Sequence, residues 1–140
     1  MIKVNKEKIA ELLIRNKNIS FAYLFGSYAK NKIRFGSDLD IGIYFNAEPT
    51  IFEIGILVNE LEDITEHEID LVSLKNLYEI NPKLAYSVVA DGILLFSIDE
   101  QLLVQYKKNV FLKYLDFKPV IDLFTRKLNE RISNNKFADF

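Results

Sequence analysis

The segment DLDIGIYF at residues 38–45 has a large apolar residue at every second position, and this period strongly predicts a β-strand. Successive side chains of a strand point to opposite sides of its sheet. The odd-numbered residues are all apolar and form a face suited to a core: Leu39, Ile41, Ile43 and Phe45. The other face carries two aspartates, Asp38 and Asp40. A chain containing this segment therefore builds a sheet that presents two carboxylates side by side.

These two aspartates lie about 6.6 Å apart along one face of the strand. Two like charges beside a core are costly unless a positive group compensates them. Magnesium prefers carboxylate oxygens and keeps substrate phosphates as further ligands, and two-ion sites place their ions about 3.5–4 Å apart around shared groups. We therefore predict that Asp38 and Asp40 bind two Mg²⁺ ions. The plainer alternative is that both aspartates form the wet face of an edge strand.

A third carboxylate is expected from a neighbouring strand. The segment HEIDLVSL at residues 67–74 predicts another strand, and Asp70 interrupts its apolar pattern between Ile69 and Leu71. We predict that Asp70 completes the metal site, with Glu68 on the same face as a less favoured substitute. A solvent-facing position for this acidic segment is the alternative reading.

Gly26 and Ser27 follow a buried strand predicted at residues 19–25. A glycine between a strand and a helix start lets the backbone approach an anion closely, and N–H groups at a helix N-terminus favour phosphate. We predict that Gly26, Ser27, Lys30 and Ser37 hold the phosphates of a nucleotide, with Lys32 and Arg34 as further cations. Taken alone, a Gly-Ser pair is an ordinary turn.

The other predicted elements place these segments in one mixed arrangement of helices and strands. A fourth strand is expected at residues 93–96. Asn81 and Pro82 predict a helix start, and Gly92 predicts the C′ residue of that helix. From Pro49 a helix is expected to about residue 62, with an apolar stripe of Ile51, Ile54, Val58 and Leu61. The remaining helices are expected at 6–16, 28–34, 99–115 and, after a break at Pro119, 119–133.

Composition narrows the class of protein. The 140 residues are 49% hydrophobic, which suits a single domain with a sizeable core. The absence of cysteine excludes disulfides, zinc–thiolate sites and thiol nucleophiles, and suits a reducing cytoplasm. Neither a signal-peptide pattern nor an apolar run long enough to span a bilayer is present, so no membrane association is expected. The net charge of −2 argues against direct nucleic-acid binding, although a local basic patch stays possible.

Other candidates are weaker. His67, the single histidine, could orient Asp70, but a surface position is the plainer reading. No Ser-His-Asp arrangement or Walker A string is present. Aromatic residues between 106 and 124 are either core or a partner-binding surface.

One motif resembles the Gly-Ser-x10-Asp-x-Asp signature of the polymerase-β-like nucleotidyltransferase superfamily. It consists of Gly26 and Ser27, ten intervening residues, and then Asp38, Leu39 and Asp40. Within this superfamily, GSYAKNKIRFGSDLDIGIYF is similar to the minimal nucleotidyltransferases, and the resemblance continues through EIDLVSL and NPKLAYSVVADGILLF. The segment YLDFKPVIDLFTRKL resembles the tail of MntA-type antitoxins, which pair with HEPN-domain toxins. One departure is Lys30-Asn31, where many relatives have Arg-Gly.

The resemblance implies an α+β fold: a small mixed sheet flanked by helices, with a core at about residues 1–98 and a helical extension at about 99–133. It also implies Mg²⁺-dependent transfer of AMP from ATP, with release of pyrophosphate, to a tyrosine hydroxyl of a cognate HEPN ribonuclease. The chain would then be the antitoxin of a type VII toxin–antitoxin system, with Asp70 as candidate base. A small-molecule acceptor, as in aminoglycoside nucleotidyltransferases, and a non-catalytic toxin-binding antitoxin are the alternatives.

Overall fold

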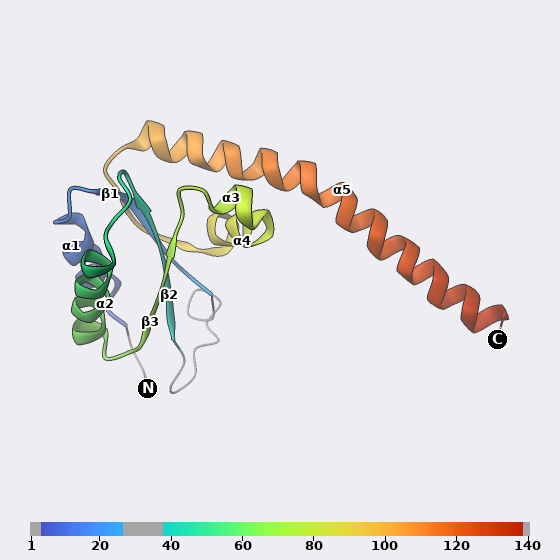
Figure 1. Cartoon of the computed structure of the whole chain (residues 1–140), viewed down its shortest axis with the longest axis horizontal. Coiled ribbons are helices and arrows are strands. Elements are labelled where there is room, and N and C mark those ends of the chain that lie inside the picture. Colours follow the sequence, from blue (N-terminus) through green and yellow to red (C-terminus); the bar gives the residue numbers. More distant parts are fainter. Residues whose placement is uncertain (1–3, 27–37, 139–140) are drawn as a thin grey trace.

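The computed structural model describes residues 4–26 and 38–138. The helix expected at 28–34 lies outside the described residues. The described chain forms a four-stranded sheet with helices on both faces (Figure 1). This arrangement confirms the predicted mixed sheet flanked by helices.

The strands are β1 (Ile19–Phe25), β2 (Leu39–Phe45), β3 (Ile69–Ser73) and β4 (Ile93–Ser97), in the spatial order β3-β2-β1-β4. β1 pairs antiparallel with both β2 and β4, whereas β2 and β3 run parallel. Every residue of β1 is buried, because this strand is central and both sheet faces are covered. The four predicted strands are therefore confirmed, with ends within two residues.

Each face of the sheet packs on its own set of helices. On one face, α1 (Lys6–Ile14) and α2 (Ile51–Thr65) pack against the odd-numbered residues of β2, as predicted from their alternation. On the other face, α3 (Leu77–Ile80), α4 (Pro82–Asp91) and the first part of α5 (Glu100–Ala138) cover Phe21, Tyr23 and Phe25. The even-numbered residues of β2 point toward this second layer, because Tyr44 packs against it.

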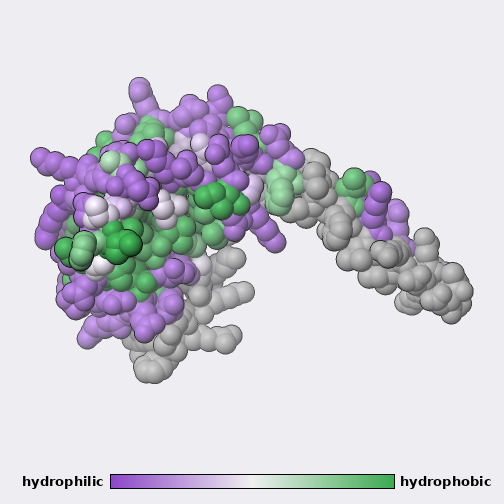
Figure 2. All heavy atoms as spheres, viewed as in Figure 1, coloured by the Kyte–Doolittle hydropathy of each residue, from purple (hydrophilic) through white to green (hydrophobic). Residues whose placement is uncertain are grey.

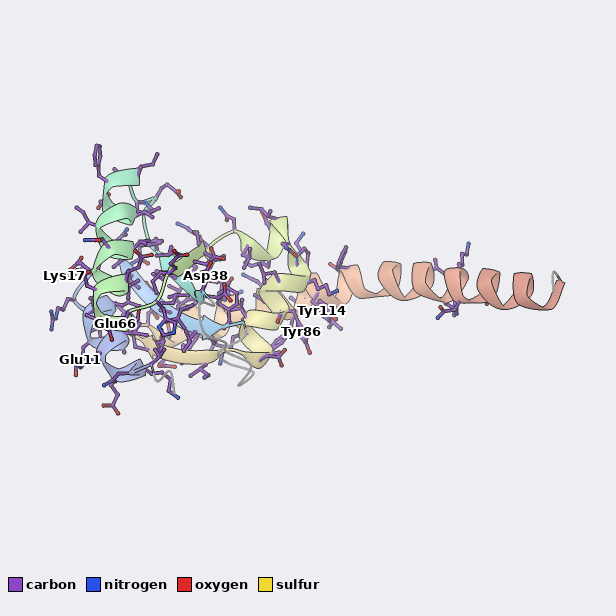
Figure 3. The ribbon with its side chains drawn as sticks, turned by 90° about the horizontal axis from the view of Figure 1, so that it is seen from below. Glu11, Lys17, Asp38, Glu66, Tyr86 and Tyr114 are labelled. Atoms are coloured by element: carbon purple, nitrogen blue, oxygen red, sulfur yellow. The ribbon has the colours of Figure 1, made fainter. Side chains whose placement is uncertain are left out.

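The predicted face of α2 is partly wrong. Thr50 caps the helix in a capping box with Glu53, so α2 begins after Pro49 rather than at it. Leu57 and Leu61 are the apolar residues of α2 that the core buries, whereas Ile51 is 87% exposed. Ile51 begins α2, and the first turn of this helix extends beyond the rest of the molecule (Figure 3).

The start of α4 is as predicted, and its end differs in conformation. The Asn81 side chain accepts a hydrogen bond from the Leu84 N–H at 3.1 Å, and Pro82 follows as the first helical residue. Gly92 ends the helix with extended backbone, φ −75° and ψ 166°, rather than in the left-handed C′ geometry. A Cβ at this position would overlap the Val88 carbonyl oxygen, so close packing explains the glycine. The single-turn α3 was not predicted.

The break predicted at Pro119 is wrong, because α5 is one continuous helix of 39 residues. A proline removes one intrahelical hydrogen bond and crowds the preceding turn, which bends a helix without always ending it. Figure 1 shows α5 bending part-way along its length, and its second half extends away from the rest of the molecule. Among the described residues, no helix combines the length and apolar character needed to cross a membrane.

Candidate active site

Asp40 and Asp70 are brought together by the parallel pairing of β2 and β3. The two residues are partners in the ladder, so their side chains leave the sheet on the same face. The Leu39 N–H donates to the Glu68 carbonyl at 2.8 Å and fixes this register at its start. The Ile69 N–H donates to the Glu62 carboxylate of α2 at 3.2 Å, which anchors the beginning of β3. The predicted meeting of carboxylates from two strands is therefore present.

The pair lies on the sheet face that α3, α4 and α5 cover. Asp40 is the ladder partner of Phe25 in β1, and Phe25 packs in the core of that layer. Asp40 is half-buried and Asp70 is exposed, so the pair spans the boundary between core and solvent. This position leaves Asp70 accessible to a bound molecule.

The surroundings of Asp40 raise the pKa of its carboxyl group. Its pKa is raised from 3.8 to about 6, first by burial and then by the negative charge of Asp70, a hydrogen bond to Asp70 and the charge of Asp38. Each cause disfavours the ionised carboxylate. A carboxyl group with a pKa of about 6 is half-protonated at that pH, unless a bound cation compensates the same charges.

Gly26 lies against the carboxyl group of Asp40. Its φ of +75° is a left-handed conformation that glycine adopts without strain. A Cβ at this position would overlap the carboxylate of Asp40. The sequence predicted a close approach of the Gly26 backbone to phosphate, and the structure adds an approach to Asp40 that the sequence pattern did not indicate.

Asp38 stands at the entrance to β2, one residue before the strand begins. Its side chain is exposed, on the body of the molecule (Figure 3), and its charge acts on Asp40. Within the described parts of the chain, no three acidic or histidine side chains converge as a ready-made metal site. The donor chemistry of Asp40 and Asp70 nevertheless fits a hard cation, because two crowded carboxyl oxygens are the ligands that Mg²⁺ takes.

Several predicted site residues cannot be placed in this geometry. Ser27, Lys30 and Ser37 lie outside the described residues, as do Lys32 and Arg34. Of the lesser candidates, Glu68 is exposed, and its backbone carbonyl sets the strand register. His67 lies before β3, where its Nδ1 is 2.8 Å from the Thr65 carbonyl oxygen. That contact gives the histidine a structural partner at the end of α2.

Residues 7–101 match the family described as polymerase beta, nucleotidyltransferase. The chain belongs to this nucleotidyltransferase family. The matched range includes the glycine turn and all three aspartates. The nucleotidyltransferase is also 29% identical over 75 residues to MJ0435 of Methanocaldococcus jannaschii, to which protein adenylyltransferase activity is ascribed. That match covers 54% of this chain and 80% of the relative.

Two solved structures share the fold of this nucleotidyltransferase. One is a toxin–antitoxin complex with AMP-PNP, of which a chain matches with a TM-score of 0.72 and 23% identity, covering 89% of this chain and 98% of that chain. The other is an MNT antitoxin in complex with a tri-AMPylated HEPN toxin from Shewanella oneidensis, with a TM-score of 0.64 and 21% identity. It covers 88% of this chain and 94% of that chain. These similarities show the fold of the chain.

Proposed function

We propose that this nucleotidyltransferase transfers AMP from ATP to a tyrosine hydroxyl of a cognate HEPN-domain toxin, and that it is the antitoxin of a type VII pair. The observation that carries the proposal is the carboxyl pair of Asp40 and Asp70 beside the Gly26 turn. Two kinds of relative support it: an AMP-PNP complex and a complex with an AMPylated HEPN toxin, both of the same fold. The related MJ0435 has protein adenylyltransferase activity ascribed to it as well.

In this proposal the three aspartates bind the metal ions. Asp38, Asp40 and Asp70 would hold Mg²⁺, as two ions, with the phosphates of ATP on the side of Gly26, Ser27, Lys30 and Ser37. Bound Mg²⁺ supplies charge neutralisation for the triphosphate and lowers the pKa of a coordinated hydroxyl. The raised pKa of Asp40 shows that burial and the charges of Asp70 and Asp38 disfavour its ionised form, which a bound cation would compensate.

The reaction joins the tyrosine oxygen to the α-phosphorus of ATP. A new P–O bond forms, the bond to pyrophosphate breaks, and the tyrosine gives up its proton. Asp70 is the candidate acceptor of that proton, because it is exposed and lies beside the half-buried Asp40. Since the reaction consumes ATP and acts on a ribonuclease, we place it in the cytoplasm.

The test is incubation of the purified chain with ATP labelled in the α-phosphate, Mg²⁺ and the HEPN-domain protein encoded beside it. Label recovered on a tyrosine of that protein supports the proposal, and loss of its ribonuclease activity supports the antitoxin role. Label on an added aminoglycoside instead of the protein contradicts the acceptor class. Tight binding of the HEPN protein without any label contradicts the catalytic role.

A further inference from the structure

Helix α5 has two apolar faces, and the fold uses one of them. Its inner face holds Leu103, Tyr106 and Val110, all buried against α3, α4 and the sheet. The Tyr106 hydroxyl donates to the Leu74 carbonyl at 2.6 Å and fastens the helix to the end of β3. Stacking of Tyr86 on Tyr114, with centroids 4.0 Å apart, makes a further contact where α5 leaves the body (Figure 3).

The opposite face of α5 carries leucines whose side chains are exposed to solvent. Leu112 is 51% exposed, Leu115 is 59% exposed and Leu123 is 44% exposed. Positions separated by three, four, eight or eleven residues share one side of a helix, so these three leucines form one stripe. We call Leu112, Leu115 and Leu123 the outer stripe. Hydrophobic residues lie at the surface along this part of α5 in the space-filling view (Figure 2).

The outer stripe begins beside a shallow groove between α3 and α5. The groove has a volume of about 290 Å³, and Leu112 lines it together with Tyr78 and Glu79 of α3. The polar residues Asn109, Lys113 and Asp116 also line it. The groove therefore offers polar partners beside the apolar outer stripe, and protein–protein interfaces combine apolar contacts with polar ones.

The part of the chain that carries this stripe lies beyond the nucleotidyltransferase family match, which ends at residue 101 just as α5 begins. The similarity to the chain of the toxin–antitoxin complex is longer. Residues 1–101 are less than three quarters of the chain, so a match over 89% of it extends into α5. The helix is thus an addition to the catalytic fold that is shared with a protein crystallised with its toxin.

We infer that the outer stripe of α5 is the docking surface for the HEPN-domain toxin, and that it presents the toxin to the carboxyl pair. This inference rests on the proposed function and names the surface that selects its substrate. A helix of 39 residues is about 58 Å long, so it offers a long contact outside the catalytic fold. The stripe acts in binding and leaves the chemistry at Asp40 and Asp70 unchanged.

The test variant replaces the whole stripe with a polar helix former: Leu112→Gln, Leu115→Gln and Leu123→Gln. The matched control is Ile51→Gln with Ile56→Gln on α2, since those side chains are 87% and 62% exposed on a different helix. Circular dichroism verifies that both variants keep their helices. The measurements are toxin affinity by calorimetry, the kcat and KM of AMP transfer to the toxin, and the mass of the isolated chain in solution.

The stripe variant is expected to bind the toxin at least about tenfold more weakly, with a raised KM and a kcat close to that of the wild type. The α2 control is expected to match the wild type. A stripe variant that binds and modifies the toxin normally overturns the inference, as does a weakened α2 control. A wild-type chain that dimerises alone through the stripe also overturns it, because the surface then serves a second copy. A wild-type chain that neither binds nor modifies the toxin instead refutes the proposed function itself.

Discussion

At the scale of single residues, the proposed chemistry of this chain depends on how Asp40 is placed. It is half-buried beside Asp70, with Asp38 near enough to add its charge, and its pKa is raised to about 6. A group whose pKa is higher in the folded state than its ordinary 3.8 binds more protons when folded. The stability that this proton confers is present below about pH 4 and is lost as the pH rises through about 6.

A neutral isostere of Asp40 removes this pH dependence. We predict that Asp40→Asn, measured with a chelator present, is more stable than the wild type at pH 8, because asparagine carries no charge to crowd against Asp70. The advantage shrinks at pH 4.5, where the wild-type carboxyl is itself protonated. Urea unfolding of both proteins at the two pH values measures the difference. An advantage that is equal at both pH values would show that the charge of Asp40 is not the cause.

The conformation of Gly26 gives a second prediction at this scale. We expect Gly26→Ala to reduce AMP transfer by about a hundredfold, because its Cβ displaces the Asp40 carboxylate and its φ of +75° strains an alanine. Gly55→Ala is the matched control, since its Cβ meets open space on α2 and alanine favours a helix. Transfer rates of the two variants are compared with that of the wild type. Full activity in Gly26→Ala would show that the turn at Gly26 is not part of the active site.

At the scale of elements, the turn from α2 into β3 holds a non-glycine residue in the left-handed region. Glu66 has φ 56° and donates its N–H to the Glu62 carbonyl at 2.8 Å (Figure 3). We predict that Glu66→Gly raises the free energy of unfolding by about 0.5–1 kcal/mol, because glycine adopts this conformation without strain. Glu60→Gly, at an exposed position inside the same helix, is expected to lower it by about 1 kcal/mol. Denaturant midpoints of both variants test the contrast.

The strands and the carboxylates could be predicted from the sequence because their signals are local. Alternation in β2 placed Asp40 on a face opposite Leu39 and Ile41, and the register with β3 then brought Asp70 beside it. The helices were predicted less well where their surroundings decide the outcome. Burial of Leu57 rather than Ile51 depends on where α2 crosses α1 and the sheet. The raised pKa of Asp40 needs neighbours from two strands, which no single segment contains.

At the scale of the whole molecule, the chain combines a nucleotidyltransferase fold with the long helix α5. The division into a core to about residue 98 and an extension from 99 stays a prediction, and α5 begins at Glu100. The core places two carboxyl groups beside a glycine turn, and the extension carries an apolar stripe that the core leaves uncovered. We therefore assign the chemistry to the first part and selection of the partner to the second.

The central claim is that Asp40 and Asp70 act as one site. Its most direct test is the rate of AMP transfer to the HEPN toxin by Asp40→Asn, by Asp70→Asn and by the double variant. We predict that each single change removes nearly all transfer and that the double change removes little more, because residues that act as a unit are strongly non-additive. Losses that multiply in the double variant, or transfer at the wild-type rate in either single variant, would contradict the account.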